Sequence, residues 1–376
     1  MRKILILAGR YLPGYKDGGP VRSIVNLCEW MGDEYDIRIM CLDRDHGDTE
    51  RYPDITIKEY NNVGKAKVWY TPSFLSEDIE KLAADSDVVY VCGPYSDYAR
   101  YAMKLKKAGR ISAPLYIASM GSFSPKAFKI KGLKKRLFID YMKLTGMFRG
   151  VTWSVTSDRE KSELKAIIGS GAECIIASDL PRRGITEHTH TKEKDALNLV
   201  FVSRISRKKN LSAVPDILRN TDENIKIKLD IYGTPEDKQY LNECLQKLDE
   251  LKRTHPGCKW EYKGEADSNE VPEIFAAYDA FLFPTLGENY GHVIAESLAA
   301  GCIPVISDTT PWMDIAEKGC GYVCSLPDKK EFAKAIDELA LMDEEEHQKL
   351  RIACVDYITS VNEASVLNSG YRKIFS

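Results

Sequence analysis

Short, strongly apolar runs alternate with longer amphipathic stretches along most of this 376-residue sequence. A first series of strand-like runs comprises Lys3–Ala8, Ile37–Leu42, Val88–Cys92, Leu115–Ser119, Val151–Thr156 and Cys174–Ala177. A second series comprises Leu199–Ser203, Ile227–Tyr232, Lys259–Lys263, Ala280–Pro284 and Ile303–Ser307. Helical stretches such as Val21–Met31, Tyr95–Ala108 and Asp158–Ile168 lie between them. Because strands this apolar need helices over both faces of a parallel sheet, the pattern predicts an α/β fold.

A polar segment separates the two series of strands. Residues 181–195 contain almost no apolar residue, a composition typical of a linker. We predict an N-terminal domain over residues 1–180, a linker over 181–196, a C-terminal domain over 197–358, and a helix over 359–376 that packs back on the N-terminal domain. Each half resembles a doubly wound sheet, which binds ligands at the carboxyl ends of its strands. A ligand is therefore expected in a cleft between the two domains.

Composition narrows the class of protein. The chain is 44% hydrophobic and 29% charged, which excludes disordered, collagen-like and coiled-coil chains. It has no apolar run long enough to span a bilayer, and the N-terminal apolar stretch of five residues is too short for a signal peptide. The ten cysteines form no Cys-x-x-Cys pair. We therefore expect a cytoplasmic protein with reduced thiols.

The charge is unevenly distributed along the chain. The whole chain has a net charge of −3, but residues 1–190 contain 30 Lys and Arg against 24 Asp and Glu, and the remainder is acidic. This mild asymmetry argues against a nucleic-acid partner. The positive half is compatible with an anionic small molecule, with a membrane surface, or with ordinary surface variation.

The segment from Phe283 to Ser307 carries the most informative motif. It reads as a buried strand, a turn containing Gly287 and Glu288, a helix that begins near Gly291, and a second buried strand. Free N–H groups in the first turn of such a helix attract an anion. Glu288 and Glu296 could each accept hydrogen bonds from neighbouring hydroxyls of a ribose or a sugar ring. Either glutamate alone would be an ordinary helix residue, but the helix around Glu296 is apolar, so its charge requires a partner.

These residues resemble the signature of the retaining glycosyltransferases of family four. The resemblance rests on two glutamates with seven residues between them, the first of which lies within Gly-Glu-Asn-Tyr-Gly-His, and it extends over essentially the whole chain. It implies the GT-B architecture of two Rossmann-like domains around a cleft. The continuation from Ser307 to Trp312 resembles a bacterial subgroup that builds surface polysaccharides. The resemblance implies that Glu288 contacts the donor sugar and Glu296 the ribose, in a donor site that includes Asn289, Tyr290, Gly291 and His292.

A second motif, Val202–Asn210, follows a buried strand and is predicted to precede an amphipathic helix. It resembles the Gly-Arg-Leu-x-x-x-Lys-Gly/Asn element of the family, with Ser203 where glycine is common. By position, Arg204 and Lys209 match the two cations that hold the donor diphosphate, and such cations replace the metal ion that other sugar transferases use. The alternative is a solvated charge run, although basic residues at a helix N-terminus oppose the helix dipole. The donor site implied by the resemblance also includes Lys263 and Gly264.

A third motif, Tyr11–Pro20, follows the first strand directly. It resembles the first glycine-rich loop of the family, in which two glycines open a helix that faces the diphosphate and the acceptor. Gly18 and Gly19 would then let backbone N–H groups reach the ligand. Gly-Gly-Pro by itself is more often only a turn.

Two places depart from the family pattern. The loop Ser119–Ser122, which contains Met120 and Gly121 of the expected acceptor region, lacks the histidine that many members have there. The usual Pro-Asn-Gly at the end of the first domain is replaced by Ser178-Asp179-Leu180-Pro181. These departures put the acceptor side in question more than donor binding.

Other candidate sites carry weaker signals. Asp43-Arg44-Asp45 has the spacing of a metal-binding Asp-x-Asp motif, but two acidic residues in a loop are usually solvated. His188 and His190 lie in the predicted linker without further ligands, so a metal site is not expected. Gly169-Ser-Gly171 follows a helix and lacks a third glycine, which excludes a nicotinamide-cofactor fingerprint.

The segment Pro125–Arg136 is basic and partly amphipathic. It contains Lys126, Lys129, Lys134 and Lys135 and no acidic residue. Such a segment suits either an anionic membrane surface or a plain solvated helix. Lysines recur in the corresponding region of the family, after the acceptor loop.

The sequence thus predicts a glycosyltransferase, and the resemblance implies that it is a retaining enzyme that needs no metal or other cofactor. It would move a sugar from a nucleotide diphosphate donor, with a UDP-sugar favoured, to a glycan or lipid-linked glycan, with contact at the inner membrane surface. A GT-B sugar-nucleotide epimerase and a non-catalytic two-domain sugar-binding protein are the alternatives. The sugar, acceptor and linkage are not specified by the sequence.

Overall fold

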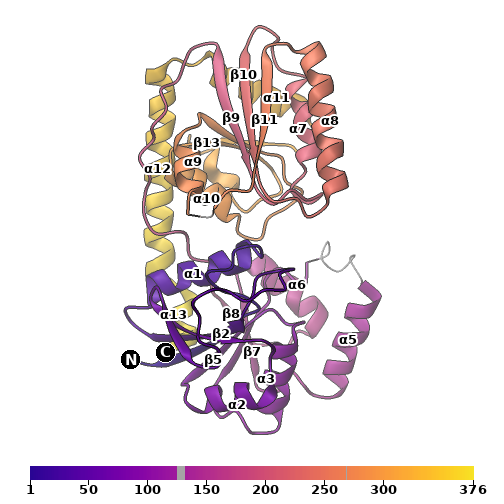
Figure 1. Ribbon diagram of the computed structural model, residues 1–376, viewed down its shortest axis with the longest axis vertical. Coiled ribbons are helices and arrows are strands. Elements are labelled where there is room, and N and C mark those ends of the chain that lie inside the picture. The colour runs from indigo at the N-terminus through magenta and orange to yellow at the C-terminus, as the bar shows by residue number, and fades with distance from the viewer. Residues whose placement is uncertain (125–131, 268) are drawn as a thin grey trace. The chain divides into compact units, whose positions relative to one another are not determined.

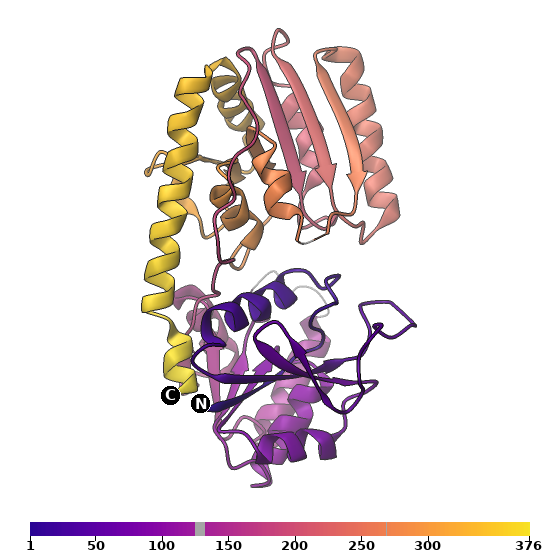
Figure 2. The same ribbon diagram turned by 60° about the vertical axis from the view of Figure 1, so that its left-hand side comes forward.

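The computed structural model describes residues 1–124, 132–267 and 269–376 (Figure 1). The chain forms two compact units, each built on its own sheet. The first unit contains Met1–Arg183 together with Ser365–Ser376, and the second contains Gly184–Ala364. In Figure 2 the strands of the second sheet at residues 196–202, 226–232 and 258–264 can be seen side by side. The predicted α/β fold with two Rossmann-like sheets is confirmed.

The first unit has an eight-stranded sheet in the order β3-β4-β2-β1-β5-β6-β7-β8. Its strands are β1 (Lys3–Leu7), β2 (Asp36–Leu42), β3 (Tyr60–Val63), β4 (Ala66–Thr71), β5 (Val88–Cys92), β6 (Leu115–Ala118), β7 (Val151–Val155) and β8 (Cys174–Ile176). Neighbouring strands are parallel, except that β3 is antiparallel to β4. The helices described in this unit are α1 (Gly19–Met31), α2 (Ser76–Ala84), α3 (Asp97–Lys107), α5 (Gly132–Leu144), α6 (Asp158–Ile168) and α13 (Gly370–Phe375).

Alternate residues of β1 enter two different hydrophobic cores, one on each face of this sheet. Ile4 and Ile6 belong to a core that includes residues of α1 and α13, whereas Leu5 and Leu7 belong to a core that includes residues of α2, α3 and α5. All four side chains are fully buried. Because successive side chains of a strand point to opposite faces, a continuous apolar run satisfies both cores at once.

The second unit has a six-stranded parallel sheet in the order β11-β10-β9-β12-β13-β14. Its strands are β9 (Ala196–Val202), β10 (Lys226–Tyr232), β11 (Cys258–Gly264), β12 (Ala280–Phe283), β13 (Ile303–Ser307) and β14 (Tyr322–Cys324). Its helices are α7 (Val214–Leu218), α8 (Lys238–Thr254), α9 (Val271–Ala276), α10 (His292–Ala299), α11 (Lys329–Leu341) and α12 (Glu344–Leu367), with 3₁₀ turns at Leu211–Ala213 and Met313–Ile315. The strand order reverses between β9 and β12, and ligands of doubly wound sheets bind at such a reversal.

The helix predicted directly after Val202–Asn210 is much shorter than an amphipathic surface helix. After Asn210, which adopts the left-handed conformation, the chain makes the 3₁₀ turn Leu211–Ala213 and then the five-residue helix α7. The basic residues of the motif therefore lie in turns and not in a helical first turn. A helix does follow the motif, but its short length was not predictable, because the apolar residues Val214, Ile217 and Leu218 suit a short buried helix as well as one face of a long one.

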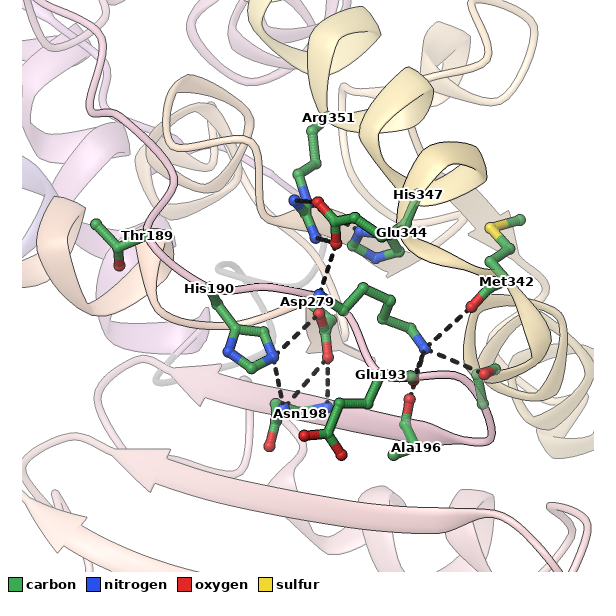
Figure 3. A network of polar contacts seen from close by, with 12 residues as sticks. Thr189, His190, Glu193, Ala196, Asn198, Asp279, Met342, Glu344, His347 and Arg351 are labelled. Atoms are coloured by element: carbon green, nitrogen blue, oxygen red, sulfur yellow. Dashed lines mark hydrogen bonds and ion pairs between the residues drawn. The ribbon is translucent and has the colours of Figure 1, made fainter.

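Residues 184–195, which lie in the predicted linker, belong to the second unit and hydrogen-bond to other parts of it (Figure 3). Lys192 is buried, and its Nζ donates to the backbone carbonyls of Ala196, Ala340 and Met342 at 2.7, 3.1 and 3.4 Å. The backbone N–H of Lys192 donates to the Glu344 carboxylate at 2.6 Å. The polar groups of this segment thus form specific hydrogen bonds within the second unit.

Candidate active site

The candidate site lies where β9 and β12 end side by side in the second unit. The loop after β9 spans residues 203–210, and the turn after β12 spans residues 284–291. Leu286 N donates to Lys208 O at 2.8 Å, and Asn210 Nδ2 donates to Pro284 O at 2.8 Å. These bonds join two of the motifs identified in the sequence, as expected from the reversal of strand order between β9 and β12.

Lys209 and Glu288 form a buried ion pair in this site. The Lys209 Nζ lies 2.8 Å from Oε1 and 2.9 Å from Oε2 of Glu288, and Thr285 Oγ1 donates to Oε1 at 2.9 Å. The two side chains are only 14% and 8% exposed. Burial lowers the pKa of Lys209, while the charge of Glu288 opposes that shift. The carboxylate thus holds the ammonium group in one position at the carboxyl edge of the sheet.

Arg204 lies in the same basic loop but is more exposed. Its guanidinium pairs with Glu236, and both side chains are about half exposed. The positive charge of Arg204 contributes to the lowered pKa of Lys209, after burial and the charge of Lys208. The loop therefore combines one buried cation, Lys209, with a more exposed one, Arg204.

Helix α10 begins at the end of the turn that carries Glu288. Its N-cap is Gly291, which has φ 85°, and its first residue is His292. A Cβ at Gly291 would lie 3.1 Å from Ile294 Cδ1 and 3.3 Å from Trp312 Nε1, so both conformation and space favour glycine. Trp312 Nε1 donates to the backbone carbonyl of Tyr290. The N-terminus of α10 is thus fixed and contains no acidic residue in its first turn.

The remaining donor-site candidates of the second unit occupy different places. Glu296 is buried in the second turn of α10, on the same helix face as His292 four residues earlier, while Asn289 is exposed in the turn. Lys263 and Gly264 end β11, two strands away from β9. Lys263 pairs there with Glu261 and lies 4.0 Å from Asp230.

The candidates of the first unit lie at the carboxyl ends of its strands. Gly18, with φ 64°, is the N-cap of α1, and Gly19 is its first residue. Met120 and Gly121 follow β6, and both have positive φ. Their loop is held by Glu160, a buried residue that the sequence analysis missed.

Glu160 accepts hydrogen bonds from the backbone N–H groups of Gly121 and Thr156 and from the Thr156 hydroxyl. Its own N–H donates to Ser157 Oγ, the N-cap of α6. The Ser-x-x-Glu spacing was a visible signal of a capping motif, but not of the bond to Gly121.

The basic segment after the acceptor loop is described only in part. Lys126 and Lys129 lie outside the described residues. Lys134 is exposed at the start of α5, whereas the Lys135 ammonium lies 5.4 Å from the centre of the Tyr95 ring.

The two weaker candidates for a metal site make ordinary protein contacts. Asp43 is fully buried and pairs with Arg44 at 2.9 Å and Arg51 at 3.0 Å. His190 Nε2 lies 2.9 Å from Asn198 Nδ2. Within residues 1–124, 132–267 and 269–376, no group of three or more His, Cys, Asp or Glu is placed to hold a metal ion.

Comparison with known proteins gives one family match and many structural matches. Residues 185–353 match the family described as glycosyl transferases group 1. No curated protein matches the chain. These 169 residues include the site built on β9, β12 and α10.

Solved structures resemble the chain over nearly its full length. HepE from Anabaena, in complex with UDP and glucose, has a TM-score of 0.65 at 15% identity, covering 97% of this chain and 98% of that one. Sucrose-phosphate synthase from Thermosynechococcus elongatus has a TM-score of 0.68 at 13% identity, covering 100% and 99%. WaaG, a glycosyltransferase involved in lipopolysaccharide biosynthesis, has a TM-score of 0.61 at 12% identity, covering 99% and 98%.

At these identities the structural likeness establishes the fold, and the family match establishes the type of domain that carries the site. Residues 185–353 of the second unit are similar to a glycosyl transferases group 1 domain, and the chain is a glycosyltransferase with the GT-B fold.

Proposed function

We propose that this enzyme moves a sugar from a UDP-sugar to a hydroxyl group of a glycan or lipid-linked glycan, with retention of the anomeric configuration and without a metal ion. The observation that carries the proposal is the buried Lys209–Glu288 pair beside the N-terminus of α10. A nucleotide diphosphate sugar has an anionic part and a hydroxyl-rich part, and this site offers a cation and a carboxylate at the same place.

Lys209 and Arg204 would stabilise the diphosphate. Negative charge develops on this leaving group as the glycosidic bond breaks, and cations already in position stabilise that charge most strongly. Lys209 is the more fixed of the two, because Glu288 holds its ammonium group. These two cations would supply the positive charge that a metal ion supplies in other sugar transferases.

The remaining donor contacts come from residues around α10. Glu288 would accept hydrogen bonds from the donor sugar and Glu296 from the ribose. The turn and helix start formed by Asn289, Tyr290, Gly291 and His292 would supply backbone N–H groups to the phosphates. Lys263 and Gly264, at the end of β11, would contact the nucleotide.

The first unit would supply the other contacts. Gly18 and Gly19 would offer backbone N–H groups to the donor, and Met120 and Gly121 would line the acceptor region. Exclusion of water from the assembled site would limit hydrolysis of the donor.

The similar structures favour UDP and a role in surface polysaccharide synthesis. HepE was solved with UDP and glucose, and WaaG is described as taking part in lipopolysaccharide biosynthesis. We propose the same nucleotide and a surface-polysaccharide acceptor for this enzyme.

We further propose that α5 rests on the cytoplasmic face of an anionic membrane. Leu137, Tyr141 and Leu144 are 63%, 60% and 89% exposed and recur at a spacing that places them on one face of the helix. The exposed basic residues of α5 are Lys134, Arg136 and Lys143, against one exposed acidic residue, Asp140. An apolar face bordered by basic residues suits the interface of an anionic bilayer. None of the helices in the described ranges combines the length and hydropathy needed to cross a bilayer.

Sedimentation with lipid vesicles tests this contact. The wild-type chain should bind phosphatidylglycerol vesicles and not phosphatidylcholine vesicles, and Leu137→Ser with Leu144→Ser should weaken binding without loss of folding. Leu341→Ser, at an exposed leucine of the second unit, is the control. Equal binding by the α5 variant and the wild type would remove α5 from the contact.

A panel of UDP-, GDP- and ADP-glucose tests the donor. A ligand at 100 times its Kd adds about 2.7 kcal/mol to the unfolding free energy, which a thermal shift assay detects. UDP-glucose should stabilise the chain most.

In a nucleotide-release assay, Lys209→Ala and Arg204→Ala should each cost roughly 2–4 kcal/mol of transition-state stabilisation, whereas Lys349→Ala, at an exposed position on α12, should have no effect.

Product analysis separates the alternatives. Transfer gives a longer glycan, epimerisation gives an isomeric nucleotide sugar, and a binding protein gives no turnover. No stabilisation by any nucleotide sugar in the panel would refute the proposal.

A further inference from the structure

A chain of three side chains lies at the carboxyl edge of the sheet in the first unit. His46 Nδ1 lies 2.7 Å from Asp17 Oδ1, and Arg10 Nη1 donates to Asp17 Oδ2 at 3.0 Å. Arg10 and Asp17 come from the loop that follows β1, and His46 comes from the loop that follows β2. The side chain of His46 is 67% exposed, whereas Asp17 and Arg10 are 25% and 19% exposed. The imidazole is thus the most exposed of these three hydrogen-bonded side chains.

The partner of Nδ1 determines what the other ring nitrogen offers. The Asp17 carboxylate only accepts hydrogen bonds, so Nδ1 of His46 must carry a proton and donate it. In the neutral ring, Nε2 then has a free lone pair and accepts a hydrogen bond. Because Arg10 holds the second oxygen of Asp17, the carboxylate and hence the ring have a defined orientation.

The backbone beneath His46 is also fixed. Asp45 is buried, and its Oδ1 accepts a hydrogen bond from the His46 N–H at 2.7 Å. Its Oδ2 accepts from the N–H groups of Tyr15 and Lys16 at 2.8 and 3.2 Å. One buried carboxylate therefore joins both loops, so the imidazole stands on a rigid base.

The position of this group in the sheet is one where ligands bind. β1 lies between β2 and β5, and the strand order of the first unit reverses there, as it does between β9 and β12 in the second unit. Asp17 directly precedes Gly18 and Gly19, where α1 begins. Ligands of doubly wound sheets bind at such a reversal.

The charges around His46 suit a hydroxyl group better than a phosphate. The charge of Arg10 is balanced by Asp17, and the Lys16 ammonium is paired with Asp48. The Asp45 carboxylate, which accepts from the backbone N–H of His46, adds a further negative charge next to this residue. A fixed hydrogen-bond acceptor without excess positive charge is what a sugar hydroxyl requires.

We propose that His46 is an acceptor-binding residue, whose Nε2 accepts a hydrogen bond from a hydroxyl of the saccharide that receives the sugar, while Asp17 and Arg10 position the ring. This inference rests on the proposed function, because a transferase needs a second substrate with a free hydroxyl in addition to its donor. It also provides an imidazole on the acceptor side, which the Ser119–Ser122 loop lacks.

The direct test measures saccharide binding by the full chain without nucleotide. The probes are the methyl glycosides of glucose, galactose, mannose and N-acetylglucosamine, and the readout is the Hε1 NMR resonance of His46, assigned by its loss in His46→Gln. At least one glycoside should move this resonance with saturation, and Asp17→Asn should weaken that response. If no glycoside in the panel moves it, the inference is overturned. Failure of UDP-glucose to bind in a separate calorimetric titration would instead refute the proposed donor.

The kinetic test separates recognition from a purely structural role. With the glycoside that binds, His46→Phe should raise the acceptor KM about tenfold, equivalent to ~1.4 kcal/mol, and leave the KM for UDP-glucose unchanged. His46→Gln, which retains a donor and an acceptor, should recover most of the affinity. His255→Phe, at a partly exposed histidine of the second unit, should match the wild type. An unchanged acceptor KM in His46→Phe, or an equal rise in both KM values, would overturn the inference.

Discussion

The buried pair between Lys209 and Glu288 allows a quantitative test of the site. We consider Lys209→Met, Glu288→Leu and the double variant, which remove the charges while keeping apolar volume. In each single variant one charge loses its partner in a place that is 14% or 8% exposed. Breaking a buried pair in this way typically costs 3–5 kcal/mol, whereas replacing both partners is often close to neutral.

The magnitude follows from the geometry of the pair. At 2.8 Å and an effective dielectric constant of about 20, the Coulomb attraction is ~6 kcal/mol, most of which offsets the loss of hydration of the two groups. Thr285 Oγ1 remains as a partner of Glu288 in Lys209→Met, so we expect the lower end of the range, about 3 kcal/mol, for that variant. The coupling free energy in the double-mutant cycle should then exceed about 2 kcal/mol.

Urea unfolding measures these quantities. Because the chain has two units, the curves from fluorescence and circular dichroism need a scheme in which the units unfold separately, and the loss should appear in the transition of the second unit. Single-variant losses below about 1 kcal/mol that simply add would show that water screens the pair. That result would contradict our view of Lys209 as a cation held in place before the donor binds.

Three further predictions concern stability. Burial, with the charge of Arg351 as the next cause, lowers the pKa of His347 to about 3. The unfolded ring takes up a proton near pH 6.5 and the folded ring does not, so this residue should lower the unfolding free energy by about 2 kcal/mol as the pH drops from 7 to 5. Urea unfolding of His347→Gln should show a weaker dependence of the unfolding free energy on pH. The same pH dependence in the variant and the wild type would contradict the assignment. Lys192→Met should cost about 1–3 kcal/mol in thermal unfolding, because it removes the donor from buried carbonyls, and an unchanged midpoint would show that water replaces it. Gly370→Ala should destabilise the first unit by about 1–3 kcal/mol in urea unfolding, because a Cβ at this position would lie 1.9 Å from Ile176 O. Gly171→Ala is the control, since a Cβ there would have no atom within 4 Å. Equal stability of the two variants would refute the argument.

The fold could be predicted from the sequence because it depends on local patterns. Apolar runs such as Ile4–Leu7 allow few structures other than a strand covered on both faces, and such strands alternate with helices along the chain. The strand order was not predictable from the same patterns, because pairing between β9 and β12 joins segments about 80 residues apart.

The candidate site was predictable in its motifs but not in its contacts. The sequence indicated Lys209 and Glu288 as separate ligands of the donor, and their mutual ion pair depends on the juxtaposition of two loops. Glu160 was missed because its bond to Gly121 spans 39 residues. The short length of α7 was not predictable, because a short buried helix and one face of a long helix have the same local pattern of apolar residues.

The first unit is assembled from both ends of the chain. Tyr371, Ile374 and Phe375 of α13 are buried in the same core as Ile4 and Ile6 of β1. Synthesis proceeds at roughly 5–20 residues per second, so these three side chains are added about 10–40 s after Arg183. The whole of the second unit is synthesised in that interval. The core of the first unit is therefore completed only after the second unit has been synthesised, and removal of residues 370–376 would destabilise the part of the molecule that was translated first.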